Sequence, residues 1–139
     1  MRLLHHGFTA LLALLLASTA LAEVSVIVHP SNASALDKDA ISRIFLGKTR
    51  GFPGGGDAIP VSFKDGSATS KEFTKSVLSK SPKQLKAYWA KMIFTGKGTP
   101  PKQLELDSEM VDLVSKNPSF IGYVASGNEG AGVKVVAKF

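Results

Sequence analysis

The junction between a predicted strand and a predicted helix at residues 58–73 constrains the fold of this chain more than any other feature. An apolar run at 58–61 leads through Asp65-Gly66-Ser67 into the helical spacing of Phe73, Val77 and Leu78. A strand that passes this tightly into a helix is typical of layered α/β domains. The first turn of such a helix presents unpaired backbone N–H groups and a partial positive charge, which favour a bound anion. The junction therefore predicts a strand, a tight turn and a helix start, together with a place for a negatively charged ligand.

The first 22 residues have the pattern of an export signal. Arg2 precedes a run of leucine and alanine at 11–17, and Ala20-Leu21-Ala22 has the small residues of a signal-peptidase site. The apolar run is shorter than the roughly 20 residues that a membrane-spanning helix needs. We therefore expect residues 1–22 to be a signal peptide and residues 23–139 to form a single periplasmic or secreted domain, without stable membrane insertion.

Charge and composition exclude several classes of function. After loss of the predicted signal peptide, sixteen Lys and Arg stand against eleven Asp and Glu, a diffuse positive charge that attracts small anions and acidic surfaces. The sequence has no arginine-rich run, aromatic stacking series or zinc-finger spacing, so we expect no nucleic-acid partner. His29 is the only histidine after residue 22, and the chain has no cysteine, so we expect no metal site. No serine has a predicted triad partner. We expect a protein that is not an enzyme and has no cofactor.

The order of the predicted elements indicates a small mixed sheet flanked by about four helices. Strands are predicted at 24–28, 58–61, 120–124 and 133–136. Helices are predicted after the capping residues Asp37, Ser81 and Asp107, and another opens near Ala68 and runs to about Ser79. Strands alternate with helices, although two helices are adjacent in the middle of the chain, and this order predicts an α/β sandwich. The spacing of Tyr88 and Trp89 with Leu85, Met92 and Ile93 favours core packing over ligand stacking.

The residues at the second helix start have two interpretations. Ser67 or Thr69 can cap the helix, and Thr69-Ser70-Lys71-Glu72 has the form of a capping box. The same hydroxyls can contribute to anion binding. The residues alone favour neither capping nor anion binding. The two roles are compatible, because a capping hydroxyl can also donate to an oxyanion.

Several stretches of the chain carry a resemblance to a known family. They are Ile44-Phe45-Leu46-Gly47-Lys48, Asp65-Gly66-Ser67-Ala68-Thr69, Ala87-Tyr88-Trp89 with Ile93-Phe94-Thr95-Gly96-Lys97-Gly98, and Asn117-Pro118-Ser119-Phe120-Ile121-Gly122-Tyr123-Val124. In order and spacing they resemble the phosphate-binding subunits of bacterial phosphate ABC transporters, within the type 2 periplasmic binding protein superfamily. The segment from Trp89 to Gly98 resembles the short, single-lobe relatives most closely. The resemblance implies an α/β domain with the fold of a single periplasmic-binding-protein lobe.

The resemblance also implies which residues bind the ligand. Two-lobed members of the family clamp an oxyanion against a turn of the form Arg-x-Asp-Gly-Ser-Gly-Thr. By this resemblance the hydroxyls of Ser67 and Thr69 donate to the anion, and the N–H groups of Ala68 and Thr69 cradle it. Two positions depart from the pattern, because Phe63 replaces the arginine and Ala68 replaces the second glycine. The implied ligand-binding residues are Asp65, Gly66, Ser67, Ala68, Thr69 and Ser70, with Lys64 and Lys71 supplying positive field.

We therefore expect an exported solute-binding module for phosphate or a similar oxyanion, accessory to phosphate transport. Its partners would be the anion and a transporter permease, another envelope protein or a second copy of the chain, since one lobe leaves its ligand exposed to water. The alternative is a protein-interaction or sensor module that kept the fold without tight ligand binding. The loss of the arginine and of the second lobe motivates this alternative.

Overall fold

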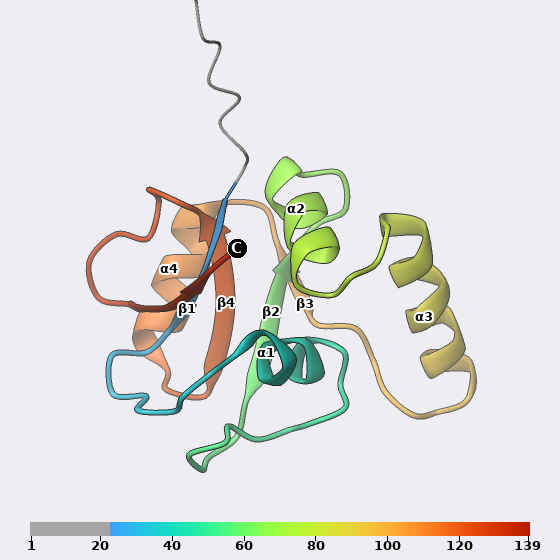
Figure 1. Ribbon diagram of the computed structural model, residues 1–139, viewed down its shortest axis with the longest axis horizontal. Helices are drawn as coiled ribbons and strands as arrows, with labels where there is room; N and C mark the ends of the chain where they lie inside the picture. Colours follow the sequence, from blue (N-terminus) through green and yellow to red (C-terminus); the bar gives the residue numbers. More distant parts are fainter. Residues whose placement is uncertain (1–22) are drawn as a thin grey trace, which may run out of the picture.

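The computed structural model describes residues 23–139, so the predicted signal peptide lies outside the described residues. This part of the chain forms one sheet and several helices (Figure 1). In chain order the elements are β1 (Val24–Val28), α1 (Lys38–Phe45), β2 (Ile59–Phe63), α2 (Ala68–Ser76), α3 (Pro82–Phe94), β3 (Lys102–Leu104), α4 (Asp107–Lys116), β4 (Phe120–Ala125) and β5 (Lys134–Lys138).

The sheet is mixed, and its strand order is β3-β2-β4-β1-β5. β2 runs parallel to both β3 and β4, whereas β1 is antiparallel to β4 and β5. The predicted fold class, a small mixed sheet with four helices, is confirmed for residues 23–139.

Helices cover both faces of the sheet, as two adjacent residues of β4 show. Tyr123 stacks on Phe73 of α2 and contacts Phe45 of α1. Gly122 faces α4 instead, and a Cβ atom there would lie 2.3 Å from Sδ of Met110. Successive strand residues point to opposite faces. The α1–α2 layer therefore lies opposite α4, and the absence of a side chain at Gly122 lets α4 approach the sheet closely.

β1 occupies a protected position inside the sheet. All five of its residues are buried, as expected for an apolar strand covered on both faces. Val24 and Phe139 exchange two backbone hydrogen bonds of 2.9 and 3.0 Å, so the first and last described strands meet at their ends.

The helix starts follow the predicted caps at two of three places. The side chain of Asp37 accepts from the Ala40 N–H, and Ser81 forms a capping box with Gln84. The prediction for α4 was wrong by one residue: Leu106 holds the cap position, and the Glu109 carboxylate accepts from its N–H at 3.1 Å. The strand β3 was also missed, because its three residues show no apolar alternation.

α3 is the helix that stands farthest from the body of the domain (Figure 1). Trp89 is its one buried residue, and it packs near Gly47, where the backbone turns with φ +70° after α1. The Tyr88 hydroxyl donates to the Leu46 carbonyl at 2.6 Å, which ties α3 to the same turn. The core role predicted for this aromatic pair is thus confirmed for Trp89, whereas Tyr88 is half-buried. Within residues 23–139 no helix has both the length and the apolar character needed to cross a membrane.

Candidate functional site

The turn between β2 and α2 has the backbone shape that the sequence predicted. Gly66 adopts φ +96°, a left-handed conformation that glycine adopts without steric cost, and no atom lies within 4 Å of where its Cβ would be. Ser67 follows as the N-cap, and its hydroxyl accepts a 3.0 Å hydrogen bond from the Ser70 N–H. Of the two predicted capping residues, the structure selects Ser67.

Two backbone N–H groups at the start of α2 can still donate hydrogen bonds to a ligand. The N–H of Ser70 is used by the Ser67 hydroxyl, and the N–H of Lys71 bonds to the Ser67 carbonyl. The N–H groups of Ala68 and Thr69 donate to no atom of residues 23–139. Ala68 is exposed and Thr69 half-buried, so this end of the helix faces solvent. The arrangement leaves two adjacent donors at the positive end of a helix dipole.

Phe63 stands at the position where the resemblance implied an arginine, and the structure shows the contacts of this side chain. Its side chain is 3% exposed and meets the Tyr123 ring edge-on, with the ring centroids 5.3 Å apart. It therefore supplies core packing at a position that would otherwise hold a charged donor.

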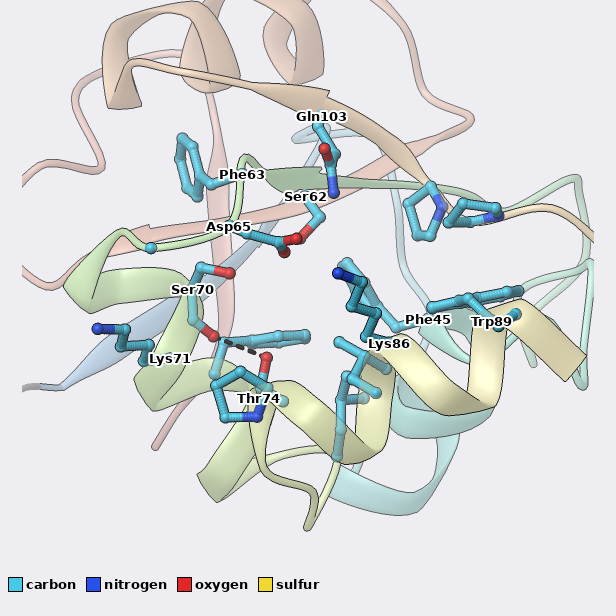
Figure 2. Close-up of a pocket in the computed structure, with 18 of the residues that line it drawn as sticks. Phe45, Ser62, Phe63, Asp65, Ser70, Lys71, Thr74, Lys86, Trp89 and Gln103 are labelled. Atoms are coloured by element: carbon cyan, nitrogen blue, oxygen red, sulfur yellow. Dashed lines mark hydrogen bonds between the residues drawn. The ribbon is translucent and has the colours of Figure 1, made fainter.

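The two lysines beside the turn differ in their electrostatic situation. Lys64 forms an ion pair with Glu105, and the hydrogen bond between them, helped by their charges, raises the pKa of Lys64 and lowers that of Glu105. Lys71 has no ion-pair partner within residues 23–139, and it lies at the edge of the cavity beside α2 with its amino group directed away from the centre of that cavity (Figure 2). The Lys64 charge is thus compensated locally, which leaves Lys71 as the nearer uncompensated cation on α2.

A cavity of about 320 Å³ lies between α2, α3 and the end of β2. Figure 2 shows Ser62, Asp65, Ser70 and Gln103 directed into it, with Lys86 reaching in from α3. Of the predicted site residues, Asp65, Gly66, Ser70 and Lys71 line this cavity, whereas Ser67, Ala68 and Thr69 do not. The predicted residues thus fall into two groups, one at the start of α2 outside the cavity and one along the cavity wall. The other walls are mainly apolar and include Phe45, Phe63, Phe73, Leu78, Leu85, Trp89 and Ile93.

Ser62, which lines this cavity, forms a hydrogen bond with the buried Tyr123. The Tyr123 hydroxyl and the Ser62 hydroxyl are 2.7 Å apart. Burial raises the pKa of Tyr123, and hydrogen bonds with Ser62 and Ser70 oppose that effect. Tyr123 therefore remains a neutral phenol near neutral pH. The sequence did not single out Ser62, Lys86 or Gln103, because β2, α3 and β3 are brought together only by the fold.

The geometry at the helix start suits a small anion better than catalysis. Two N–H groups and one lysine that have no partner among residues 23–139, together with two hydroxyls, are donors, and Asp65 is the one carboxylate of the turn. No group of three His, Cys, Asp or Glu side chains suited to a metal forms within residues 23–139.

Comparison with solved structures identifies proteins of the same fold. The chain superposes on a phosphate ABC-type transport receptor of Vibrio cholerae with a TM-score of 0.63 and 20% identity, covering 83% of this chain and 46% of the receptor. A putative phosphate ABC transporter substrate-binding protein of Clostridium perfringens, solved with bound phosphate, gives a TM-score of 0.65 at 23% identity, covering 83% and 45%. PstS of Borrelia burgdorferi gives a TM-score of 0.62 at 11% identity, covering 84% and 47%.

These similarities concern the fold, and they extend over part of the compared proteins. The chain spans a little under half the length of each of the three. No protein-family profile matches the chain, and no curated protein matches it by sequence. The predicted resemblance is confirmed at the level of structure: the chain has the mixed α/β fold of one lobe of the phosphate-transport binding proteins.

Proposed function

We propose that this protein is an exported, non-enzymatic binding module for phosphate or a similar oxyanion, and that the anion sits at the start of α2. The observation that carries the proposal is the pair of N–H groups at Ala68 and Thr69, which have no partner within residues 23–139 and lie beside the hydroxyls of Ser67 and Thr69. The fold shared with phosphate-transport binding proteins supports the choice of ligand.

The ligand would be held weakly by this lobe alone. A hydrogen bond to a charged group contributes about 1.5–3 kcal/mol net, and exposure to water reduces that amount. A few such bonds correspond to a dissociation constant in the range of roughly 1 mM to 1 μM. We propose that a second surface closes over the anion in the envelope, supplied by a transporter permease, another envelope protein or a second copy of the chain.

Calorimetric titration with phosphate, sulfate and arsenate tests the site. Ser67→Asp is the informative variant, because an aspartate caps a helix about as well as serine but places a negative charge where the anion would bind. Binding heat at millimolar phosphate should be present in the parent protein, weakened in Thr69→Ala and absent in Ser67→Asp.

The control is the same substitution at another helix start. Ser81 caps α3 as Ser67 caps α2, so Ser81→Asp adds the same charge without touching the proposed site. It should leave the binding heat unchanged. A parent protein that gives no heat at millimolar phosphate, or a Ser67→Asp variant that binds as the parent does, would refute the proposal.

The burial of Phe63 favours a second candidate, a protein-interaction or sensor module without tight ligand binding. Phe63 is 3% exposed, so the turn lacks the charge-assisted donor that an arginine supplies. This candidate expects no phosphate heat together with a complex that co-purifies from the cell envelope. A strict monomer in gel filtration without a co-purifying protein would count against it.

A further inference from the structure

The segment that contains α3 has a charge pattern unlike the rest of the chain. Residues 73–104 contain no aspartate, glutamate or arginine, whereas they contain seven lysines. Lys80 lies over the Tyr88 ring, 5.3 Å from its centroid, and Lys86 reaches into the cavity (Figure 2), whereas Lys83 and Lys91 of α3 are exposed; no acidic side chain within residues 23–139 pairs with any of the seven lysines. They are Lys75, Lys80, Lys83, Lys86, Lys91, Lys97 and Lys102.

Large apolar side chains are exposed within the same segment. Phe94, the last residue of α3, is 92% exposed, and Ile93 before it is 55% exposed. Burial of a phenylalanine side chain from water is favourable, and a phenylalanine this exposed is therefore unusual. Phe94 does not line the cavity between α2 and α3, whereas Ile93 lies at its rim.

Helical spacing places Phe94 on the outward face of α3. Lys83, Ala87 and Phe94 follow one another at intervals of four and seven residues, and all three are exposed, whereas Ala90 lines the cavity beside α2. The opposite face carries Trp89, which packs inward. Figure 1 shows α3 at the edge of the molecule, so its outward face is open to an approaching surface.

We propose that this outward face of α3 docks on an anionic phospholipid surface. Lysines attract the lipid phosphates, and Phe94 with Ile93 enters the boundary between the headgroups and the acyl chains. Contact is peripheral, since α3 lies along the surface. The inference stands apart from the anion site at α2.

Two observations favour a lipid surface over an acidic protein as the occupant. The cations are all lysines, which act as flexible point charges, whereas arginine is the residue that matches fixed carboxylate geometry. The exposed phenylalanine stands at the end of a single helix and shares its outward face with the small side chain of Ala87, which suits a deformable layer that needs no matching shape. Leu106, also exposed at 58%, has acidic neighbours Glu105 and Asp107 and so lacks this combination.

Co-sedimentation with lipid vesicles tests the proposal. The full chain is mixed with vesicles of phosphatidylcholine alone or with about 30% phosphatidylglycerol, at low and at high salt. We expect binding to the anionic vesicles alone, and a decrease of at least about tenfold in the partition coefficient at high salt, because salt screens the attraction. All variants carry the same residues 1–22, so differences between them report on the described domain.

Matched variants locate the contact. Phe94→Ser and the double variant Lys83→Glu/Lys91→Glu should each reduce the partition coefficient about tenfold or more. The controls are Leu106→Ser, which removes an exposed apolar side chain elsewhere, and Lys38→Glu/Lys48→Glu, which changes net charge equally on exposed residues outside the segment. Both controls should bind like the parent. Phe94→Trp should keep binding and show blue-shifted fluorescence with vesicles, since the indole leaves water.

Several results would overturn the proposal. These are equal binding to neutral and anionic vesicles, unchanged binding in Phe94→Ser or in the double lysine variant, or a Phe94→Trp emission that does not move on binding. Binding of soluble polyglutamate without binding of anionic vesicles would assign the face to an acidic protein instead. Circular dichroism and Tm establish that each variant is folded, which we expect because every altered side chain is exposed.

Discussion

A single buried hydroxyl connects the centre of the sheet to the loop between β4 and β5. Ser25 of β1 is fully buried, and its hydroxyl donates to the Glu129 carboxylate at 2.5 Å and lies 3.0 Å from the Ser126 hydroxyl. Glu129 also accepts from the Gly127 N–H. These hydrogen bonds favour the ionised carboxylate and lower the pKa of Glu129, with the bond from Ser25 contributing most.

The lowered pKa of Glu129 predicts a loss of stability in acid. The pKa of Glu129 in the folded protein lies below its ordinary value of 4.5. The stability that the ionised carboxylate contributes is therefore complete above pH 4.5, and it is lost as the pH falls through the lowered pKa. Glu129→Gln keeps an acceptor oxygen but cannot be protonated. Its Tm should therefore fall less than that of the parent between pH 7 and about pH 3.5, as measured by thermal unfolding.

The control for this prediction is an exposed carboxylate that makes no hydrogen bond or ion pair within residues 23–139, and Asp57 is one. Asp57→Asn should follow the parent across the same pH range. If Glu129→Gln loses as much thermal stability in acid as the parent does, the ionised form of Glu129 does not stabilise the fold.

At single residues, the sequence predicted roles where the chemistry is local. Asp37 and Ser81 were identified as caps because a cap depends on residues three positions apart, and Asp65-Gly66-Ser67 was identified as a turn for the same reason. Ser25 and Ser62 could not be assigned, because their partners lie 104 and 61 residues away along the chain. The roles of Ala68, Thr69 and Lys71 in binding stay predictions.

At the scale of elements, α3 is attached more weakly than the other long elements. It contributes Trp89 to the buried interior, while its remaining residues are half-buried or exposed. Most of the stability of a protein helix comes from tertiary packing, so one with little packing depends more on its caps. The reciprocal hydrogen bonds of Ser81 and Gln84, at 3.1 and 2.8 Å, are therefore important for this helix.

Removal of this cap should loosen α3 without unfolding the domain. Ser81→Ala loses about 1 kcal/mol of helix stability, which corresponds to a roughly fivefold change in an opening equilibrium. Hydrogen exchange in the native state should become faster at the amides of α3 by about this factor, while the amides of β1 and β4 exchange as before. Equal acceleration in β1 would show that α3 opens only with the whole domain.

The boundaries of elements were predictable only where the pattern was strong. The apolar run of β1 and the capping signals of α1 and α3 fixed those elements closely. α2 ends at Ser76, earlier than the predicted Ser79, although Val77 and Leu78 continue the apolar pattern and are buried beyond the helix end. β3 has neither β-branched residues nor alternation, and it pairs because β2 presents a free edge.

At the scale of the molecule, the stability of the sheet depends on protection of β1. β5 is one of the two edge strands of the sheet, and it pairs with β1 alone. A strand buried along its whole length becomes an exposed apolar edge when its neighbour is removed, and such edges promote association between chains.

Truncation after residue 133 should therefore cause self-association. Light scattering should show particles that grow with protein concentration, whereas the full chain should scatter as a small species at the same concentrations. Val135→Thr serves as the control, because it changes an exposed residue of β5 but leaves the strand in place. A truncated chain that stays at the size of the full chain would show that β5 does not protect β1.

The overall architecture was predictable from the alternation of apolar segments and caps, but the neighbours within the sheet were not. Strand order β3-β2-β4-β1-β5 pairs β1 with strands about a hundred residues later, and nothing local specifies such pairs. The cavity between α2 and α3 was missed for the same reason, since its walls come from five separate elements: α1, β2, α2, α3 and β3.

The reciprocal hydrogen bonds between Val24 and Phe139 hold the two ends of the described domain together. Domains whose ends lie together tolerate circular permutation and insertion into a host loop. This domain thus meets the geometric condition for both rearrangements. It could be inserted into a loop of a longer polypeptide, and its two ends could be joined and new ends opened in another loop with the strand order unchanged.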